Sequence, residues 1–421
     1  MRTERGFHGF LRFLAFLGFV GVASVAAAQA PGVVTEVRVH GNHTTPDADV
    51  LAIAAVPVGA PATDALVDGA RTRLEASRRF DGVEVRRRYA SIDDPTQIAI
   101  ILLVDEVPGV SGDDLTPGPL RRLAASGMWL PIVGYEDGYG VTYGARLALA
   151  DPLGPRSRIS VPLTWGGERR AAVEVERGFT RGLVSRLAAS AGITRRENPH
   201  DGIADRRRGV TVRAERALAP WLRVAATAGA AEVAFLDTSE RATAAGVEAV
   251  VDTRLDPTFP RNAVRAAVSA ERARFGGRPA LRRSSVDLAG YVGLVGASVL
   301  ALRAEAALAD APLPRYERAL IGGQRTLRGA PAGLAAGDNR ATLTAELRVP
   351  ITSPLSIGRF GVKAFVDAAT VWDAGQTIAT RPFTRGTGAG LFMGASLFTL
   401  DVDLARSAGH TRWSVGMRVG L

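Results

Sequence analysis

The sequence contains no cysteine. A chain without thiols forms no disulfide bond, and it offers neither a thiol nucleophile nor a thiolate ligand for a metal. Beyond the N-terminal segment it also lacks any uncharged apolar run of about 18 residues, the length that a membrane-spanning helix needs. A transmembrane β-barrel is compatible with this absence, because its strands place apolar residues only at every second position.

Enzyme signatures are lacking as well. There is no G-x-S-x-G nucleophile elbow and no P-loop. The row Gly386-x-Gly388-x-Gly390 is not followed by the helix that nucleotide binding needs, so it indicates close packing or bending in a strand. The histidines are scattered without metal-ligand spacing: His8, His40, His43, His200 and His410. The sequence therefore predicts a protein that is not an enzyme and uses neither cofactor nor metal.

The composition is 47% hydrophobic and 22% charged over 421 residues, with a net charge of +10. This length accommodates two or three soluble domains, or one small domain and a large barrel. A basic chain can bind nucleic acid, and proteins that do so usually have their arginines clustered in one stripe. Here arginine is spread through alternating segments, which favours solvated or lumen-facing side chains, with some against anionic lipid headgroups. We expect no nucleic-acid partner.

The N-terminus has the pattern of a secretory signal, which we assign to residues 1–28. The apolar core covers residues 13–25 and is followed by small residues, with cleavage favoured after Ala28 and a second site after Ala30. The alternative is an uncleaved membrane anchor, but an apolar run of about 16 residues is short for spanning. The basic region consists of Arg2, Arg5 and Arg12.

Residues 31–108 have the pattern of a small α+β domain. A strand over 33–39 alternates polar and apolar residues and ends at a turn. Helical spacing follows over 47–55 and again over 63–79, where Thr63 is a suitable N-cap. Two more strands are expected, over 83–86 and 98–104. The predicted order is β-α-α-β-β.

This order resembles the POTRA domain, the periplasmic module of outer-membrane assembly and secretion barrels. In that family a glycine usually stands just before the aromatic residue that corresponds to Phe80, whereas this sequence has Arg78 and Arg79 there. The resemblance implies that client polypeptides bind by adding a strand to an exposed sheet edge, over either 33–39 or 83–87. The matching turn and core residues are Gly41, Asn42, Gly59, Leu74, Phe80 and Val83.

Residues 109–129 have the composition of a linker, with a short helical piece around 120–126. Over residues 130–421 the hydrophobic pattern differs from that of the small domain. Segments of roughly ten residues alternate apolar with polar and are separated by turns. A soluble β-sandwich gives the same alternation. We count about sixteen segments that run to the last residue without a helix, and closure removes the edges that so large a sheet would expose. The predicted fold is mainly β, a transmembrane antiparallel barrel of about sixteen strands.

One long loop in this half, residues 311–339, contains Leu327-Arg328-Gly329. The next two strands place Glu346, Phe365 and Asp367 on the charged face. In a closed barrel those carboxylates point into the lumen, where an inward-folded loop brings Arg328 to them in a charge-assisted contact. Gly329 permits close approach of the loop backbone to the wall. The alternative is an exposed surface loop.

In these motifs the sequence resembles the BamA/TamA-like superfamily of outer-membrane assembly factors and two-partner secretion transporters. That family carries a V-R-G-F/Y loop motif tucked into the lumen against an F-x-D strand, which matches residues 327–329 and 365–367. Ala330 replaces the family aromatic. Residues 252–256 and Pro260 resemble a D-x-R-x-D…P segment, with Asn262 in place of a glycine. Residues 386–390 and 400–403 match the penultimate strands.

The C-terminal strand resembles the β-signal by which assembly machinery recognises barrels, although most such signals end in an aromatic residue. Its matching residues are Ser414, Gly416, Val419 and Leu421. The resemblance implies an outer-membrane insertase or translocase that handles unfolded outer-membrane or secreted clients, in contact with lipid and with accessory periplasmic proteins. A two-partner secretion channel and a passive or structural barrel remain as alternatives.

Overall fold

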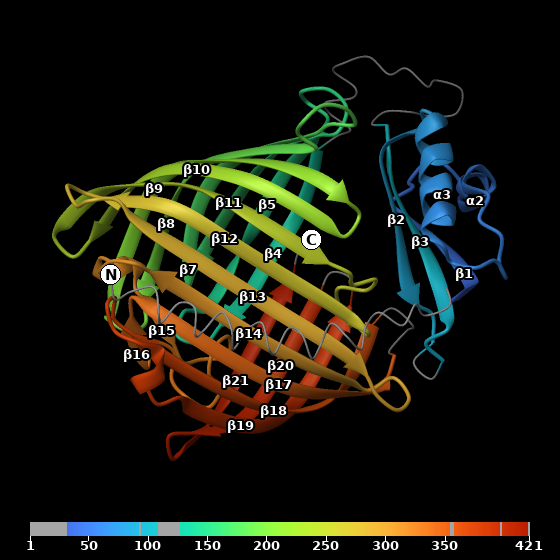
Figure 1. Ribbon diagram of the computed structural model, residues 1–421. Coiled ribbons are helices and arrows are strands. Elements are labelled where there is room, and N and C mark those ends of the chain that lie inside the picture. The colour runs from blue at the N-terminus through green and yellow to red at the C-terminus, as the bar shows by residue number, and fades with distance from the viewer. Residues whose placement is uncertain (1–31, 92–93, 108–126, 354–357, 396–397, 420–421) are drawn as a thin grey trace.

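The computed structural model describes residues 32–91, 94–107, 127–353, 358–395 and 398–419. The predicted signal, most of the predicted linker and the terminal Leu421 lie outside these residues. Two regions follow each other along the chain, a small α+β domain and a large barrel (Figure 1). Among the described residues, no helix is both long and apolar enough to cross a membrane.

The N-terminal domain, residues 32–107, has the order predicted from the sequence. A three-stranded sheet in the order β1-β3-β2 supports two helices on one face. Apolar side chains from the sheet and from both helices form its core, in which Leu74, Ile100 and Leu102 are fully buried. The elements are β1 (Val33–His40), α2 (Asp47–Ala54), α3 (Asp64–Ala76), β2 (Phe80–Tyr89) and β3 (Gln97–Glu106).

The turns of this domain account for several residues singled out in the sequence. Gly41 has φ +91°, and a Cβ there would lie 2.1 Å from the Val104 carbonyl oxygen, so only glycine fits. The Asn42 amide donates to the Thr45 carbonyl (2.8 Å) at the entrance to α2. Arg78, which stands near the glycine position of the resembling family, itself adopts the left-handed conformation (φ +58°). The left-handed residue of this turn is therefore an arginine and not a glycine.

The second region is a closed barrel of sixteen antiparallel strands within the described residues, closed by pairing of β21 with β4. Its strand number agrees with the prediction, but its first strand begins at Gly127, three residues before the predicted start of the barrel. The strands are β4 (Gly127–Glu136), β5 (Gly140–Ala150), β6 (Ser157–Gly166), β7 (Glu168–Gly178), β8 (Arg186–Asn198), β9 (Ile203–Ala219), β10 (Leu222–Phe235), β11 (Thr238–Asp252), β12 (Ala263–Phe275), β13 (Leu281–Gly293), β14 (Val299–Ala309), β17 (Asn339–Thr352), β18 (Gly358–Trp372), β19 (Thr384–Ala395), β20 (Phe398–Ser407) and β21 (His410–Val419).

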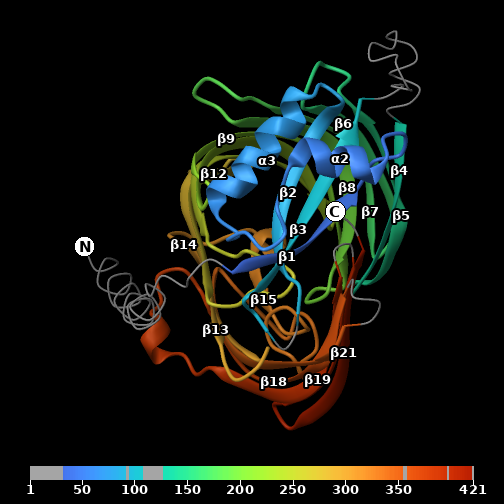
Figure 2. The same cartoon turned by 90° about the vertical axis from the view of Figure 1, so that its right-hand side faces the viewer.

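The N-terminal domain lies in front of one opening of this barrel (Figure 2). Arg156, in the β5–β6 turn, forms an ion pair with Glu75 of α3 (2.8 Å). Arg359, at the start of β18, donates to the Tyr89 carbonyl of β2 (3.3 Å). We call this opening the domain end and the other the loop end.

The long loop between β14 and β17 lies at the loop end and carries a two-stranded sheet of its own. That sheet pairs β15 (Ala319–Ile321) with β16 (Ala335–Gly337). Two 3-10 turns, η1 (Arg315–Glu317) and η3 (Ile378–Thr380), are the only helical turns of the barrel region within the described residues.

Candidate functional site

The loop between β14 and β17 folds into the barrel and buries Arg328, which is 6% exposed. Its guanidinium binds Asp367 of β18 through two donors, Nε to Oδ2 at 2.7 Å and Nη2 to Oδ1 at 2.8 Å. A third donor, Nη1, reaches Glu346 of β17 at 2.5 Å. The backbone N–H of Arg328 also donates to Asp367 (3.2 Å). This two-donor geometry is the one that makes arginine a specific partner for a carboxylate.

Aromatic and apolar contacts surround this ion pair. The guanidinium stacks on the ring of Phe365, 3.3 Å from its centroid. Leu327 is fully buried and packs with Ile321, Ala330 and Ala369. Ala330, where the resembling family has an aromatic, is therefore part of a small apolar cluster and is 2% exposed.

Three glycines create the space that the loop occupies. Gly329 has φ +86°, and a Cβ on it would lie 2.9 Å from the backbone of β20. A Cβ on Gly386 of β19 would lie 2.4 Å from the Arg328 carbonyl oxygen, and one on Gly388 would lie 2.7 Å from the Phe365 ring. The glycine row of β19 therefore serves close packing, as the absence of a following helix indicated: Gly386 lies against the loop and Gly388 against Phe365.

Asp403 also belongs to this cluster. It lies on the charged face of its strand but was not among the residues predicted for the loop contact. Asp403 of β20 is fully buried, 3.7 Å from Arg328 and 3.1 Å from the Lys363 amine. Lys363 also pairs with Asp401. Alternation along 400–403 contained the signal for this contact, but only the tertiary structure shows that both cations converge there.

The loop also reaches the two strands that close the barrel. Its Gln324 fills the space over Gly416 of β21, where a Cβ would lie 2.1 Å from the Gln324 Oε1 atom. Arg325 lies 3.8 Å from Glu136 of β4. Ser414 is buried on β21, the backbone of Val419 pairs with Val133 of β4, and Leu421 lies outside the described residues.

A second polar cluster lies at the domain end, in the β11–β12 turn. Asp256 is 2% exposed and accepts from the Arg359 guanidinium (2.9 Å) and from the Thr258 backbone N–H (2.9 Å). Burial raises the pKa of Asp256, but the hydrogen bonds from Thr258 and the charge of Arg359 outweigh it, and the net shift is downward. Asn262 adopts φ +46°, the left-handed conformation expected of it.

The described residues contain no group of three or more His, Asp or Glu side chains that could hold a metal ion. The other sequence-predicted residues, Gly59, Leu74, Phe80 and Val83, lie in the N-terminal domain, Gly59 in a turn and the rest in or against the core. They are separate from the lumen cluster.

A closed barrel with a loop bound inside its lumen defines a class of outer-membrane β-barrel protein. The profile of the Omp85 superfamily domain matches residues 142–420. The chain belongs to the Omp85 superfamily. No curated protein sequence matches it.

Two solved structures are similar in fold. BamA from Haemophilus ducreyi lacking POTRA domains 1–3 is 16% identical with a TM-score of 0.62, over 93% of this chain and 85% of that one. CdiB from Acinetobacter baumannii is 13% identical with a TM-score of 0.51, over 93% of this chain and 74% of that one. At these sequence identities the similarity shows a shared fold and no more.

Proposed function

We propose that this protein is an outer-membrane insertase that admits client strands at the seam between β4 and β21. In this proposal residues 1–28 are a signal peptide, 31–108 a periplasmic POTRA domain and 109–126 a linker. The membrane barrel covers 127–421, because its first strand, β4, begins at Gly127. Membership of the Omp85 superfamily and the closed barrel support the general assignment to outer-membrane insertion or secretion. The seam supports the specific one.

The seam is the weakest junction that the barrel wall offers at these strands. Three residue pairs join β21 to β4 in the described residues, whereas ten join β20 to β21 and ten join β4 to β5. Because each pair contributes backbone hydrogen bonds, a short ladder opens at lower cost than its neighbours. The unpaired backbone of an opened seam accepts a client strand as any sheet edge does.

The lumen loop is placed to respond to this opening. Arg328 anchors it to β17 and β18, while Gln324 and Arg325 lie against β21 and β4 on the two sides of the seam. Separation of β4 from β21 therefore alters the contacts of the loop. We propose that the cluster of Arg328, Asp367, Glu346, Phe365 and Asp403 is a loop lock, which keeps the loop in one arrangement while the seam changes.

A disulfide across the seam tests this proposal, and the native absence of cysteine keeps the experiment free of background thiols. Tyr135 and Met417 are paired in the seam, so Y135C/M417C staples β4 to β21. The matched control L400C/M417C staples β20 to β21, which do not separate. We expect the seam staple to abolish client insertion into liposomes until a reductant is added. Full insertion by the oxidised seam variant would exclude the proposal.

The lumen loop gives a specific reason to keep secretion through the barrel as the second candidate. A client that crosses the lumen must displace the loop, whereas a client that enters the seam need not. The substitution pair A330C/A369C staples the loop to the wall within their shared apolar cluster. Complete loss of client transport with this staple, together with normal transport by the seam staple, would identify a secretion channel.

The exposed sheet edges of the N-terminal domain support the proposal that this domain binds clients. β3 is central, so β1 and β2 are the two edge strands. The beginning of β1 is already covered, because Val34 exchanges backbone hydrogen bonds with Gly59 and Ala60. The edge that we assign to clients is therefore β2, over 83–87. Accessory periplasmic proteins are candidates for the same edge.

Proline at two successive β2 positions tests this edge. N–H groups of neighbouring residues point to opposite sides of a strand, so of E84P and V85P one removes a donor from the β3 ladder and the other from the open edge. The open-edge variant should keep the helical signal at 222 nm and lose crosslinking to clients. Undiminished crosslinking by a folded open-edge variant would count against the assignment.

A further inference from the structure

Arginines on the barrel wall divide into two groups according to the face from which they project. Neighbouring residues of a strand project to opposite faces, and residues opposite each other in antiparallel register share a face. The lumen face is fixed by Glu346 and Asp367, and the register carries it around the barrel. Four arginine pairs or runs are split between the faces: 169–170, 195–196, 206–208 and 282–283.

The inward members are all ion-paired. Arg170 binds Glu174 (2.6 Å), Arg196 binds Glu136 (2.8 Å) and Arg207 binds both Asp205 and Glu317 (2.6 and 2.7 Å). Arg283 likewise binds Glu271 (2.6 Å). Their charges are neutralised inside the protein.

The outward members are exposed, and within the described residues their side chains have no ion pair and no hydrogen bond. Arg169 of β7 is directly opposite Arg195 of β8, and Arg195 is directly opposite Arg206 of β9. Three guanidinium groups thus form one row across three adjacent strands. Like charges placed opposite each other on a sheet are destabilising. An anion from outside the chain would relieve this repulsion.

The neighbouring inward row has the contrary pattern. Glu168, Arg196 and Asp205 occupy the corresponding register positions there and alternate in sign. Two acidic side chains lie near the row on the outward face. Glu197 of β8 is two residues along the strand from Arg195, and Glu232 of β10 is opposite Arg208 and Arg241 and bonded to Ser239. Within the described part of the chain, neither carboxylate forms an ion pair with Arg169, Arg195 or Arg206, and the three arginines outnumber the single carboxylate beside them, so the row keeps a net positive charge.

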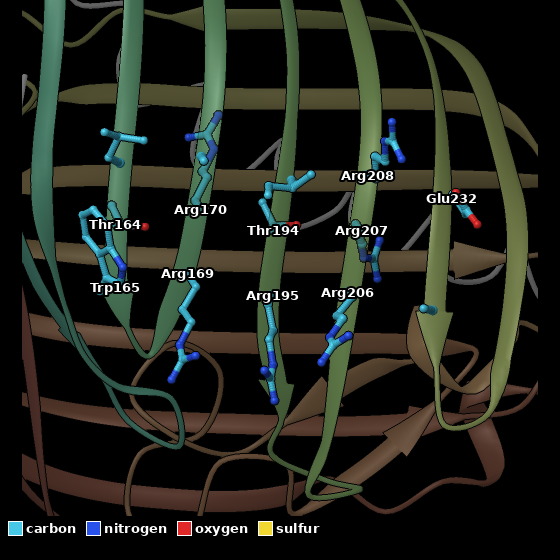
Figure 3. Close-up of a pocket in the computed structure, with 14 residues that line it drawn as sticks. Thr164, Trp165, Arg169, Arg170, Thr194, Arg195, Arg206, Arg207, Arg208 and Glu232 are labelled. Atoms are coloured by element: carbon cyan, nitrogen blue, oxygen red, sulfur yellow. The ribbon is translucent and has the colours of Figure 1, made fainter.

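A groove on the outer wall contains this row (Figure 3). Arg169, Arg195 and Arg206 extend in the same direction, toward the end at which the β8–β9 turn lies, with Trp165 beside them. Each is within three residues of the end of its strand at the loop end. The outward side chains deeper in the wall, such as Ile193, Val210 and Val212, are apolar and exposed. The row thus borders an apolar surface, as basic residues at a membrane interface do.

We propose that the outward row of Arg169, Arg195 and Arg206 binds the phosphate groups of an anionic glycolipid in the outer leaflet. Guanidinium groups bind phosphate through paired hydrogen bonds, and the apolar wall beneath accepts the acyl chains. The assignment to the outer leaflet rests on the proposed periplasmic position of the N-terminal domain, since the row lies at the opposite end. Arginines scattered along the sequence are here gathered in space, which the sequence analysis did not foresee.

The test measures binding of bisphosphorylated lipid A to the purified full-length protein in neutral detergent micelles, by native mass spectrometry. Because each surface arginine contributes roughly fivefold to the binding of anionic lipid, R169Q/R195Q/R206Q should bind about 100-fold more weakly. The matched control R177Q/R181Q/R216Q removes three exposed arginines near the domain end and should change binding less than about twofold. Equal binding by the row variant and the wild type would overturn the proposal.

Further measurements on the wild-type protein identify the source of the anion, and they do not depend on the folding of a variant. Wild-type protein should prefer bisphosphorylated to dephosphorylated lipid A, and inorganic phosphate at the same phosphate concentration should not displace the lipid. No preference, displacement by inorganic phosphate, or displacement by polyglutamate of equal charge would each reject a lipid site. The assay requires no client and no insertion, so a failure here is distinct from a failure of the proposed function.

Discussion

The interiors of the N-terminal domain and of the barrel are built from opposite kinds of side chain. Leu74, Ile100 and Leu102 fill the domain, whereas the barrel encloses ion pairs and presents apolar residues such as Val210 outward. Both regions use strands whose side chains alternate with period two. The comparison shows that alternation specifies a two-faced sheet, and that the surrounding medium decides which face is inside.

The barrel interior is itself divided. Around Arg328 the ion pairs are dry, since Arg328, Glu346, Asp367 and Asp403 are each at most 6% exposed. Elsewhere the lumen is wetter, as at Arg303, whose side chain is 50% exposed beside Asp287. A pair in water contributes about 0–1 kcal/mol, while removal of one partner from a buried pair costs several times more.

The largest effect is expected from the dry cluster. Arg328→Ala leaves the buried Asp367 without its cation and removes one of the two arginines that pair with Glu346. It should destabilise the barrel by about 3–5 kcal/mol. Unfolding in urea is measured by tryptophan fluorescence, which reports on the barrel alone because all five tryptophans lie there. Arg303→Ala is the matched control from the wet lumen, expected to cost about 0–1 kcal/mol.

Because the two side chains act as one unit, Asp367→Ala should impair function as Arg328→Ala does. The double variant should be little worse than either single one. Strictly additive losses of function would show that the two side chains act independently. The buried pair at Arg328 would then be no more important than the solvent-exposed pairs elsewhere in the lumen.

The apolar core of the N-terminal domain should be the next most sensitive. Leu74→Ala removes a fully buried side chain and should destabilise the domain by roughly 2–5 kcal/mol. Both described α-helices belong to this domain, so ellipticity at 222 nm follows its unfolding. Val210→Ala, an outward residue of the barrel, is the contrasting variant. In detergent, this variant should lower the stability of the barrel only slightly. Equal losses of stability in the two regions would contradict the view that apolar side chains face inward in the domain and outward in the barrel.

A smaller effect follows from pH. Burial raises the pKa of Glu106, but hydrogen bonds from Thr45 and the Thr44 backbone N–H (2.8 Å) outweigh it, so the folded-state pKa is lowered. A lowered pKa means that this carboxylate stabilises the domain above its unfolded pKa, about 4.3, and that the contribution is lost as pH falls through the folded value. Glu106→Gln should flatten the acid limb of domain stability at 222 nm. An unchanged limb would contradict this.

The smallest effect concerns a helix end. The Thr63 hydroxyl accepts from the Leu66 backbone N–H (3.2 Å) and caps α3. Thr63→Ala should cost about 1 kcal/mol, and Thr63→Ser, which keeps the hydroxyl, close to nothing. Urea unfolding at 222 nm distinguishes the two. Equal stability of the Ala and Ser variants would mean that the cap is not needed.

Much of the architecture was determined by local pattern. Alternation with period two, turn residues and helical spacing predicted the β-α-α-β-β domain and a barrel of sixteen strands, because these signals depend on neighbours in the sequence. The contact of Arg328 with Asp367 and Glu346 was also predicted, with the help of a family resemblance. The shortness of the ladder between β4 and β21 was not.

Only the tertiary structure decided the other long-range contacts. Barrel closure brings β21 beside β4, and the folded loop brings Gln324 to Gly416 and Arg328 to Asp403, across distances in sequence that no local pattern encodes. The same holds for Arg169, Arg195 and Arg206, which the register of three strands aligns in one row. A sequence fixes the face from which a side chain projects, because the strand period is two, but strand register fixes its neighbours.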